Sequence, residues 1–179
     1  MSVPSPAPAL ARAFEAARAA RARVVFPEWE EPRIARAVAR LKDEGLADPV
    51  PLPPVTPAQM AALVGARGVK ESLAVRMLEK PLIRAAAMVA AGEADAMVAG
   101  IAAPTRRVIE AAGLAIGLAD GVAAPSSFFL MVLPGGQGGV REMIFADCAV
   151  TVDPAAARLA AIATASTTLD AAPSRYGST

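Results

Sequence analysis

The residues best suited to binding chemistry lie at positions 100–107. Gly100 follows a short apolar stretch, and Thr105 is expected to cap a helix that carries Arg106 and Arg107 and runs to about Gly117. Backbone N–H groups at the start of a helix, together with the positive end of its dipole, favour an anion. Two guanidinium groups would add positive charge at the same place. The segment predicts a phosphate-binding site at Thr105, Arg106 and Arg107, and the alternative is a capped helix with solvated arginines.

Only one of these two arginines is expected to face a cleft. Consecutive residues of a helix point about 100° apart, and we favour Arg106 over Arg107. Glu110 follows one turn further along the helix and counts against a phosphate-binding interpretation, because it would reduce the positive charge there.

A second group of polar residues flanks two apolar stretches further along the chain. Ser126 and Ser127 precede one stretch, where their hydroxyl groups would either bind a phosphate or satisfy backbone groups in a turn. Asp147 ends the other stretch, and a cap or turn role is favoured over a place in a cleft. Cys148 is expected to be a small buried hydrophobic residue, since no His is available to form its thiolate.

The composition excludes several other kinds of chemistry. The 179 residues include no His and one Cys, which excludes a Ser-His or Cys-His pair, a His-ligated metal and an internal disulfide. A net charge of +1 provides no overall field for nucleic acid or an anionic membrane. Glu28, Glu30 and Glu31 could hold a divalent ion, but a solvated turn is the favoured interpretation. We expect no metal, no nucleic-acid partner and no membrane partner.

Periodic patterns place these residues in an α/β fold. Strands alternate with helices over the first 120 residues, which indicates a mainly parallel sheet, and helical patterns begin near Pro32, Pro57 and Pro81. The prolines between residues 49 and 54 exclude that segment from the centre of a sheet. A second subdomain is expected from about Gly121, where a glycine-rich turn joins two apolar stretches. The predicted strands cover residues 23–26, 46–54, 94–99, 122–133 and 140–145.

Four motifs in this order resemble the phosphate acetyltransferase / phosphate butyryltransferase family. They are Val24-Val25-Phe26-Pro27-Glu28 with Pro32-Arg33, the segment Gly92–Gly100, the segment Pro125–Met131, and Phe145–Val150 followed by Asp153-Pro154. The resemblance covers about residues 10–170, and the order of the motifs makes it specific.

The resemblance implies a three-layer α/β sandwich like that of isocitrate and isopropylmalate dehydrogenases, in a cytoplasmic homodimer. It implies an acyltransferase that moves an acetyl group between coenzyme A and inorganic phosphate, giving acetyl phosphate. Coenzyme A is then a substrate, and no metal or prosthetic group is expected. The alternatives are a phosphate butyryltransferase, or a non-catalytic regulatory module that binds coenzyme A or acyl-CoA.

The sequence also departs from the family pattern. Family chains continue well past Thr179, and the resemblance places their catalytic Ser, Arg and Asp in that later part, so we expect this chain to be inactive alone. Residues 1–120 would then be the N-terminal part of the first domain, and residues 121–179 the start of an incomplete second domain. Glu110 stands where many members carry a cleft Arg, whereas Arg67 matches a segment with basic residues near coenzyme A. The segment 174–179 resembles a non-catalytic loop of the family more than its catalytic turn.

Overall fold

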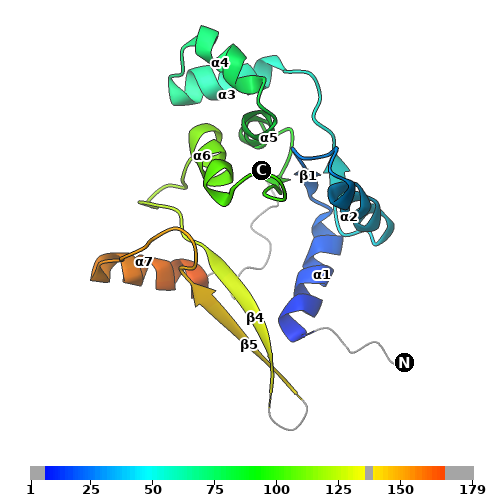
Figure 1. The fold of residues 1–179 in the computed structure, drawn as a ribbon, viewed down its shortest axis with the longest axis vertical. Helices are drawn as coiled ribbons and strands as arrows, with labels where there is room; N and C mark the ends of the chain where they lie inside the picture. The colour runs from blue at the N-terminus through cyan, green and yellow to red at the C-terminus, as the bar shows by residue number, and fades with distance from the viewer. Residues whose placement is uncertain (1–6, 136–138, 168–179) are drawn as a thin grey trace. The chain divides into compact units, whose positions relative to one another are not determined.

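The computed structural model describes residues 7–135 and 139–167 (Figure 1). These residues form two compact units. One unit is residues 17–119, and the other combines the described residues up to Ala16 with those from Asp120 onward. Helix α1 (Pro8–Ala20) contributes residues to both units.

The 17–119 unit contains a parallel sheet, which confirms the predicted α/β class. Its strands are β1 (Arg23–Val25), β2 (Asp48–Val50) and β3 (Ala96–Met97), in the order β2-β1-β3. Pro49 lies in β2 at an edge of this sheet, as the prolines predicted, because a residue without an N–H group interrupts a central ladder. β3 is shorter than the predicted 94–99 strand, since its partner β1 is itself only three residues long.

Five helices complete this unit: α2 (Pro32–Asp43), α3 (Pro57–Arg67), α4 (Glu71–Leu78), α5 (Pro81–Ala90) and α6 (Thr105–Ala115). Three of them begin with proline, whose fixed φ suits a first turn and whose missing N–H costs nothing there. The Glu31 side chain accepts a hydrogen bond from the Arg33 amide and caps α2. The Thr56 hydroxyl does the same for α3 through the Gln59 amide. Local sequence signals thus account for these helix starts.

Adjacent residues of β1 face opposite sides of the sheet and define three layers. Val24 packs with Ile34 and Val38 of α2, whereas Val25 packs with Ala85 and Met88 of α5. Successive strand side chains alternate in this way, so a strand with apolar residues on both faces needs a helix on each side. The sheet therefore lies between α2 and α5, and its carboxyl-terminal end leads into the loops that carry Glu28 and residues 100–103.

A separate apolar cluster joins α5 to its neighbouring helices. Leu63 of α3 and Leu78 of α4 are fully buried with Ala86 and Ala87 of α5 and Ala111 of α6. Small alanine side chains allow α5 and α6 to approach closely.

The other unit contains the predicted antiparallel hairpin and a helix. Strand β4 (Phe128–Pro134) pairs with β5 (Val140–Ala146), and α7 (Ala156–Thr167) follows. The Gly135 amide donates to the Gly139 carbonyl at 2.8 Å, and residues 136–138 lie outside the described part. β4 begins six residues later than predicted, because only residues from Phe128 find a partner on β5.

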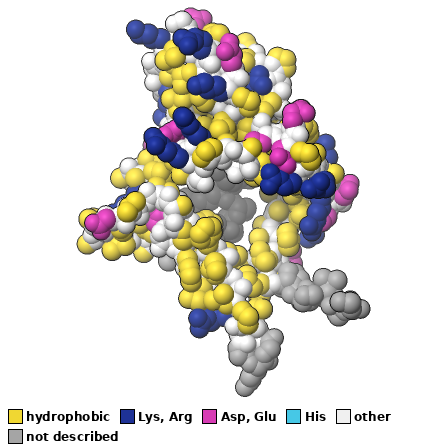
Figure 2. Space-filling view, viewed as in Figure 1, with side chains coloured by type: hydrophobic (Ala, Val, Ile, Leu, Met, Phe, Trp, Pro, Cys, Tyr) yellow, Lys and Arg dark blue, Asp and Glu magenta, His cyan; other side chains and the backbone are white. Residues whose placement is uncertain are grey.

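The hairpin is apolar on both faces and exposed. Phe128, Leu130 and Val132 alternate with Phe129 along β4, and all four are exposed, Phe129 by 57%. Hydrophobic side chains accordingly cover the hairpin in Figure 2. A contiguous exposed apolar surface of this kind is typical of a region that packs against another surface.

Candidate functional site

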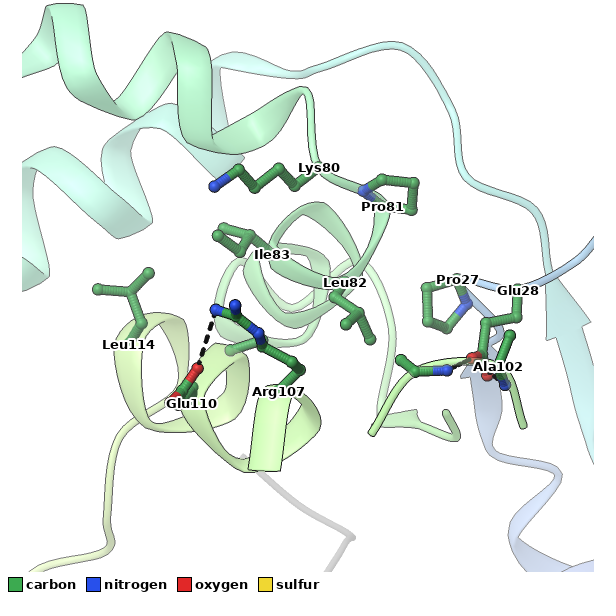
Figure 3. Close-up of a pocket in the computed structure, with 12 residues that line it drawn as sticks. Pro27, Glu28, Lys80, Pro81, Leu82, Ile83, Ala102, Arg107, Glu110 and Leu114 are labelled. Carbon is green, nitrogen blue, oxygen red and sulfur yellow. Dashed lines mark hydrogen bonds and ion pairs between the residues drawn. The ribbon is translucent and has the colours of Figure 1, made fainter. Parts of the chain in front are cut away.

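A pocket of about 650 Å³ lies in the 17–119 unit, at the ends of β1 and β3 (Figure 3). Ligands of open α/β sheets bind at the carboxyl ends of the strands, which is where this pocket lies. One wall is the start of α5, another is a face of α6, and the remaining wall is formed by residues 27–28 and 102–103. The lining side chains are Pro27, Glu28, Lys80, Pro81, Leu82, Ile83, Ala102, Ala103, Arg107, Glu110, Ala111 and Leu114.

The loop after β3 holds a carboxylate of the chain itself. Glu28 Oε2 accepts hydrogen bonds from the amides of Gly100 and Ile101 at 2.8 and 3.0 Å, and its Oε1 accepts from those of Ala102 and Ala103 at 2.8 and 2.7 Å. Partial burial would raise the pKa of Glu28, but the four amides together lower it below its ordinary value. The backbone donors of this loop are therefore directed at Glu28, and an external anion at the pocket has to use side chains.

Two carboxylates of the acidic turn 28–31 are already engaged within the chain. Glu28 faces the loop amides, whereas Glu31 caps α2 and pairs with Arg33 at 2.8 Å. Among residues 7–135 and 139–167 no group of three or more His, Cys, Asp or Glu side chains is placed to hold a metal ion. These carboxylates serve as hydrogen-bond acceptors for the backbone.

Thr105 does not cap α6. The N-cap residue is Pro104, whose carbonyl accepts from the Arg107 amide at 2.8 Å, and Thr105 is already the first helical residue. The expectation that Thr105 caps this helix is wrong, because the preceding proline has an extended conformation that ends the loop one residue earlier.

Arg106 and Arg107 share one carboxylate. Arg106 Nε lies 2.7 Å from Glu110 Oε1, and an Arg107 guanidinium nitrogen lies 3.4 Å from Glu110 Oε2. Hydrogen bonds from Arg106 and the charges of both arginines lower the pKa of Glu110, although some desolvation opposes this effect. Arg107 lines the pocket and Arg106 does not, which is the reverse of the expected preference. Ion pairs this exposed hold their partners weakly.

Arg67 lies at the other end of α6. Its guanidinium donates to the carbonyls of Ala115 and Ile116, at 3.3 Å for Ala115, and so caps the carboxyl-terminal end of the helix. Gly117 follows with φ of +83°, and a side chain there would overlap the Arg67 guanidinium. Arg67 does not line the pocket, and its contact with coenzyme A stays a prediction.

The two predicted serines belong to the other unit. Ser126 is exposed. The Ser127 hydroxyl donates to Asp147 Oδ1 and accepts from the amides of Cys148 and Ala149 at 3.0 and 2.8 Å. Every polar contact of Ser127 thus satisfies the turn after β5, and a role of either serine in binding substrate stays a prediction.

Asp147 organises that same turn. Its Oδ2 accepts from the Thr151 amide at 2.9 Å, and its Oδ1 accepts from the Ser127 amide at 3.0 Å. Desolvation would raise the pKa of Asp147, but these hydrogen bonds and the Ser127 hydroxyl hold it far below its ordinary value. The Cys148 thiol donates to the Phe145 carbonyl and is exposed, so the expectation of a buried cysteine is wrong. Phe145, Ala146 and Ala149 are exposed as well, so this whole turn lies at the surface of its unit.

Lys80 is a charged pocket residue that the sequence did not reveal. It is the N-cap residue of α5 without a side-chain cap hydrogen bond, and its side chain runs along the pocket past Ile83 (Figure 3). The sequence indicated only that a helix starts at Pro81, next to Lys80. It did not indicate that the packing of α5 against α6 brings Lys80 and Arg107 to one pocket.

Comparisons with known proteins show what this chain is similar to. A family model described as phosphate acetyl/butaryl transferase matches residues 55–172. A phosphate acetyltransferase from Paracoccus denitrificans is 38% identical, over 86% of this chain and 54% of its own length. One from Haemophilus influenzae is 32% identical, over 83% of this chain and 24% of its own length. The chain thus spans about half, or less, of the length of these relatives.

A solved structure agrees with the sequence comparison. The crystal structure of a phosphotransacetylase from Streptococcus pyogenes superposes with a TM-score of 0.79 at 26% identity, over 95% of this chain and 60% of that one. The family model covers well over half of the chain and includes α5, α6 and the loop at 102–103. The chain belongs to the phosphate acetyl/butaryl transferase family.

Proposed function

We propose that this protein acts in acyl transfer between coenzyme A and inorganic phosphate, with acetyl phosphate as the acyl phosphate. The observation that supports the proposal best is the family match over residues 55–172, because this span includes most of the pocket lining. The pocket combines two cationic side chains, Lys80 and Arg107, with apolar side chains of α5 and α6. A site of this kind suits a ligand that carries phosphate on an otherwise less polar body.

The reaction asks for charge stabilisation and positioning. The thiolate sulfur of coenzyme A bonds to the acetyl carbonyl carbon, and the bond from that carbon to the phosphate oxygen breaks, so that phosphate leaves with the electron pair. The acyl group is already activated, and a covalent protein nucleophile is not required. Lys80 and Arg107 would hold phosphate groups, while Glu28 fixes the loop that closes one side of the pocket. The catalytic Ser, Arg and Asp that the resemblance implies are not assigned to residues of this chain.

Formation of acetyl-CoA tests the proposal. Acetyl phosphate and coenzyme A are mixed with the natural protein that contains this chain and, as a positive control, with the Paracoccus relative, and the thioester is followed by its absorbance. We expect turnover by the natural protein. Its failure to form acetyl-CoA beside an active control would refute the proposed activity.

A second candidate is a regulatory module that binds coenzyme A or acyl-CoA without turnover. The pairing of Glu110 with Arg106 and Arg107 favours it, because this carboxylate reduces the positive charge available to a substrate phosphate. Calorimetric titration with coenzyme A and acetyl-CoA separates the two candidates, since binding without turnover by the natural protein supports the module.

Several finer expectations stay proposals. The exposed apolar hairpin supports a homodimer, which analytical ultracentrifugation would test. A cytoplasmic location, the absence of a metal or prosthetic group, and acetyl rather than butyryl specificity rest on the resemblance. None of the described helices combines the length and apolar composition needed to cross a bilayer.

A further inference from the structure

The pocket in the 17–119 unit has four charged side chains, and they differ in the hydrogen bonds and ion pairs that they already form within the chain. Both oxygens of Glu28 accept hydrogen bonds from the four amides of residues 100–103. Glu110 pairs with Arg106 and Arg107. The Lys80 ammonium forms no hydrogen bond or ion pair with any of the described residues. Lys80 is therefore the pocket cation that a ligand can meet without displacing an existing partner.

Arg107 offers a less favourable contact for an anion. Its guanidinium faces Glu110 at 3.4 Å, so a phosphate that approaches it is repelled by the carboxylate or has to displace it (Figure 3). Because this ion pair is exposed and long, it is weak enough to be exchanged for a more highly charged partner. Removing the charge of Glu110 would release both arginines at once.

The remaining lining describes the rest of the ligand. Ile83 lies between the Lys80 and Arg107 side chains, with Leu114 on one side and Leu82 on the other, and the three give the pocket an apolar surface (Figure 3). A small free anion would leave this surface exposed to water. A phosphate group attached to an apolar or weakly polar body would cover it and gain the additional burial.

We propose that Lys80 is the main phosphate-binding residue of this pocket, that Glu110 limits its affinity, and that the phosphate belongs to a ligand whose less polar part covers Leu82, Ile83 and Leu114. This inference rests on the proposed function for the identity of the ligand, which is coenzyme A or an acyl phosphate. It assigns the recognition to side chains of α5 and α6, in place of the backbone loop that the sequence favoured.

Two substitutions of opposite effect test the inference. Lys80→Met retains most of the aliphatic stem and removes the charge, and we expect it to weaken binding of coenzyme A about fivefold, as for the loss of one exposed charged contact. Glu110→Gln should strengthen the same binding about threefold, because it frees Arg107. Dissociation constants are measured by isothermal titration calorimetry at low salt, where exposed charges are least screened.

Matched controls are available in the same unit. Lys70 is the N-cap of α4 without a side-chain cap hydrogen bond, as Lys80 is of α5, but it does not line the pocket. Glu79 is an exposed carboxylate at the end of α4 that is also outside the pocket. Lys70→Met changes the net charge by as much as Lys80→Met does, and Glu79→Gln by as much as Glu110→Gln does. Both control variants should bind coenzyme A as tightly as wild type. The unfolding midpoint of each variant, followed by the fluorescence of Trp29, confirms that it is folded.

Three probes identify the source of the phosphate. Coenzyme A, acetyl phosphate and pantetheine, which lacks phosphate, are titrated into wild type and Lys80→Met. If Lys80→Met binds coenzyme A or acetyl phosphate more weakly than wild type does but binds pantetheine equally well, the inference is supported and the affected probe identifies the ligand. Equal affinity of wild type and Lys80→Met for both phosphate ligands overturns it and leaves the proposed function intact. Weaker binding by Lys80→Met together with a natural protein that forms no acetyl-CoA keeps the inference and refutes the proposed transferase activity.

Discussion

Replacing Glu28 by Gln should destabilise the 17–119 unit although the two side chains have the same shape. Each carboxylate oxygen accepts two amides, so an amide nitrogen in place of either oxygen faces two N–H donors. Two of the four loop amides, those of Ile101 and Ala103, are half-buried and are not freely replaced by water. At about 1 kcal/mol for each hydrogen bond that is lost or weakened, Glu28→Gln should lower the free energy of unfolding by about 2 kcal/mol.

The effect should depend on pH in a definite direction. The pKa of Glu28 is lowered in the folded chain, so its contribution to stability is fully present above its ordinary value of 4.5 and declines as the pH falls through the folded pKa. Protonated Glu28 resembles Gln. The difference in unfolding free energy between wild type and Glu28→Gln is therefore largest at pH 7 and narrows below pH 4.5.

Urea denaturation followed by the fluorescence of Trp29 measures this difference. Trp29 is the only tryptophan of the chain, is adjacent to Glu28, and packs edge-on against Phe26 with ring centroids 6.4 Å apart. Glu30→Gln is the matched control, since Glu30 lies in the same turn and is exposed. Equal stability of wild type and Glu28→Gln, or a difference that stays constant between pH 7 and pH 3.5, would refute the role assigned to Glu28.

Two further predictions concern turns at the ends of elements. Gly117→Ala should lower the free energy of unfolding by about 1 kcal/mol or more, because φ of Gly117 is +83° and a side chain there would displace the Arg67 guanidinium that caps α6. Gly113→Ala is the control in the same urea titration. Gly113 lies inside α6 with open space around it, so this substitution should not destabilise the chain. Asp147→Asn should speed hydrogen exchange of the Thr151 amide about tenfold in NMR spectra, because that amide loses its charged acceptor, whereas Asp153→Asn should not change it.

Local signals predicted most helices of this fold correctly. Pro32, Pro57 and Pro81 begin three helices, and Thr56 caps one of them through its side chain. Each of these signals acts within one helical turn, so the sequence carries it completely. The strands were predicted less well. Their ends depend on which residues of a partner strand are available, and β4 begins only where β5 can pair with it.

The main contacts of the candidate site are not local, and the sequence did not reveal them. Glu28 is 72 residues from Gly100, and nothing in the acidic turn indicates that its carboxylate fills the loop after β3. The same loop had the composition of a phosphate-binding segment, since backbone donors look alike whether they bind a ligand or a side chain. Lys80 likewise gains its place in the pocket from the packing of α5 on α6.

Neutralising Glu28 and neutralising Glu110 should have opposite effects on ligand binding, and this difference distinguishes the roles of their contacts from a simple effect of charge. Both have lowered pKa values and are charged at neutral pH, so charge alone predicts that neutralising either one improves the binding of a phosphate ligand. The contacts predict different outcomes. Glu110→Gln releases two arginines and should strengthen binding, whereas Glu28→Gln releases the loop that forms one wall and should weaken it. Stronger binding of coenzyme A by both variants would show that the loop held by Glu28 has no part in positioning the ligand.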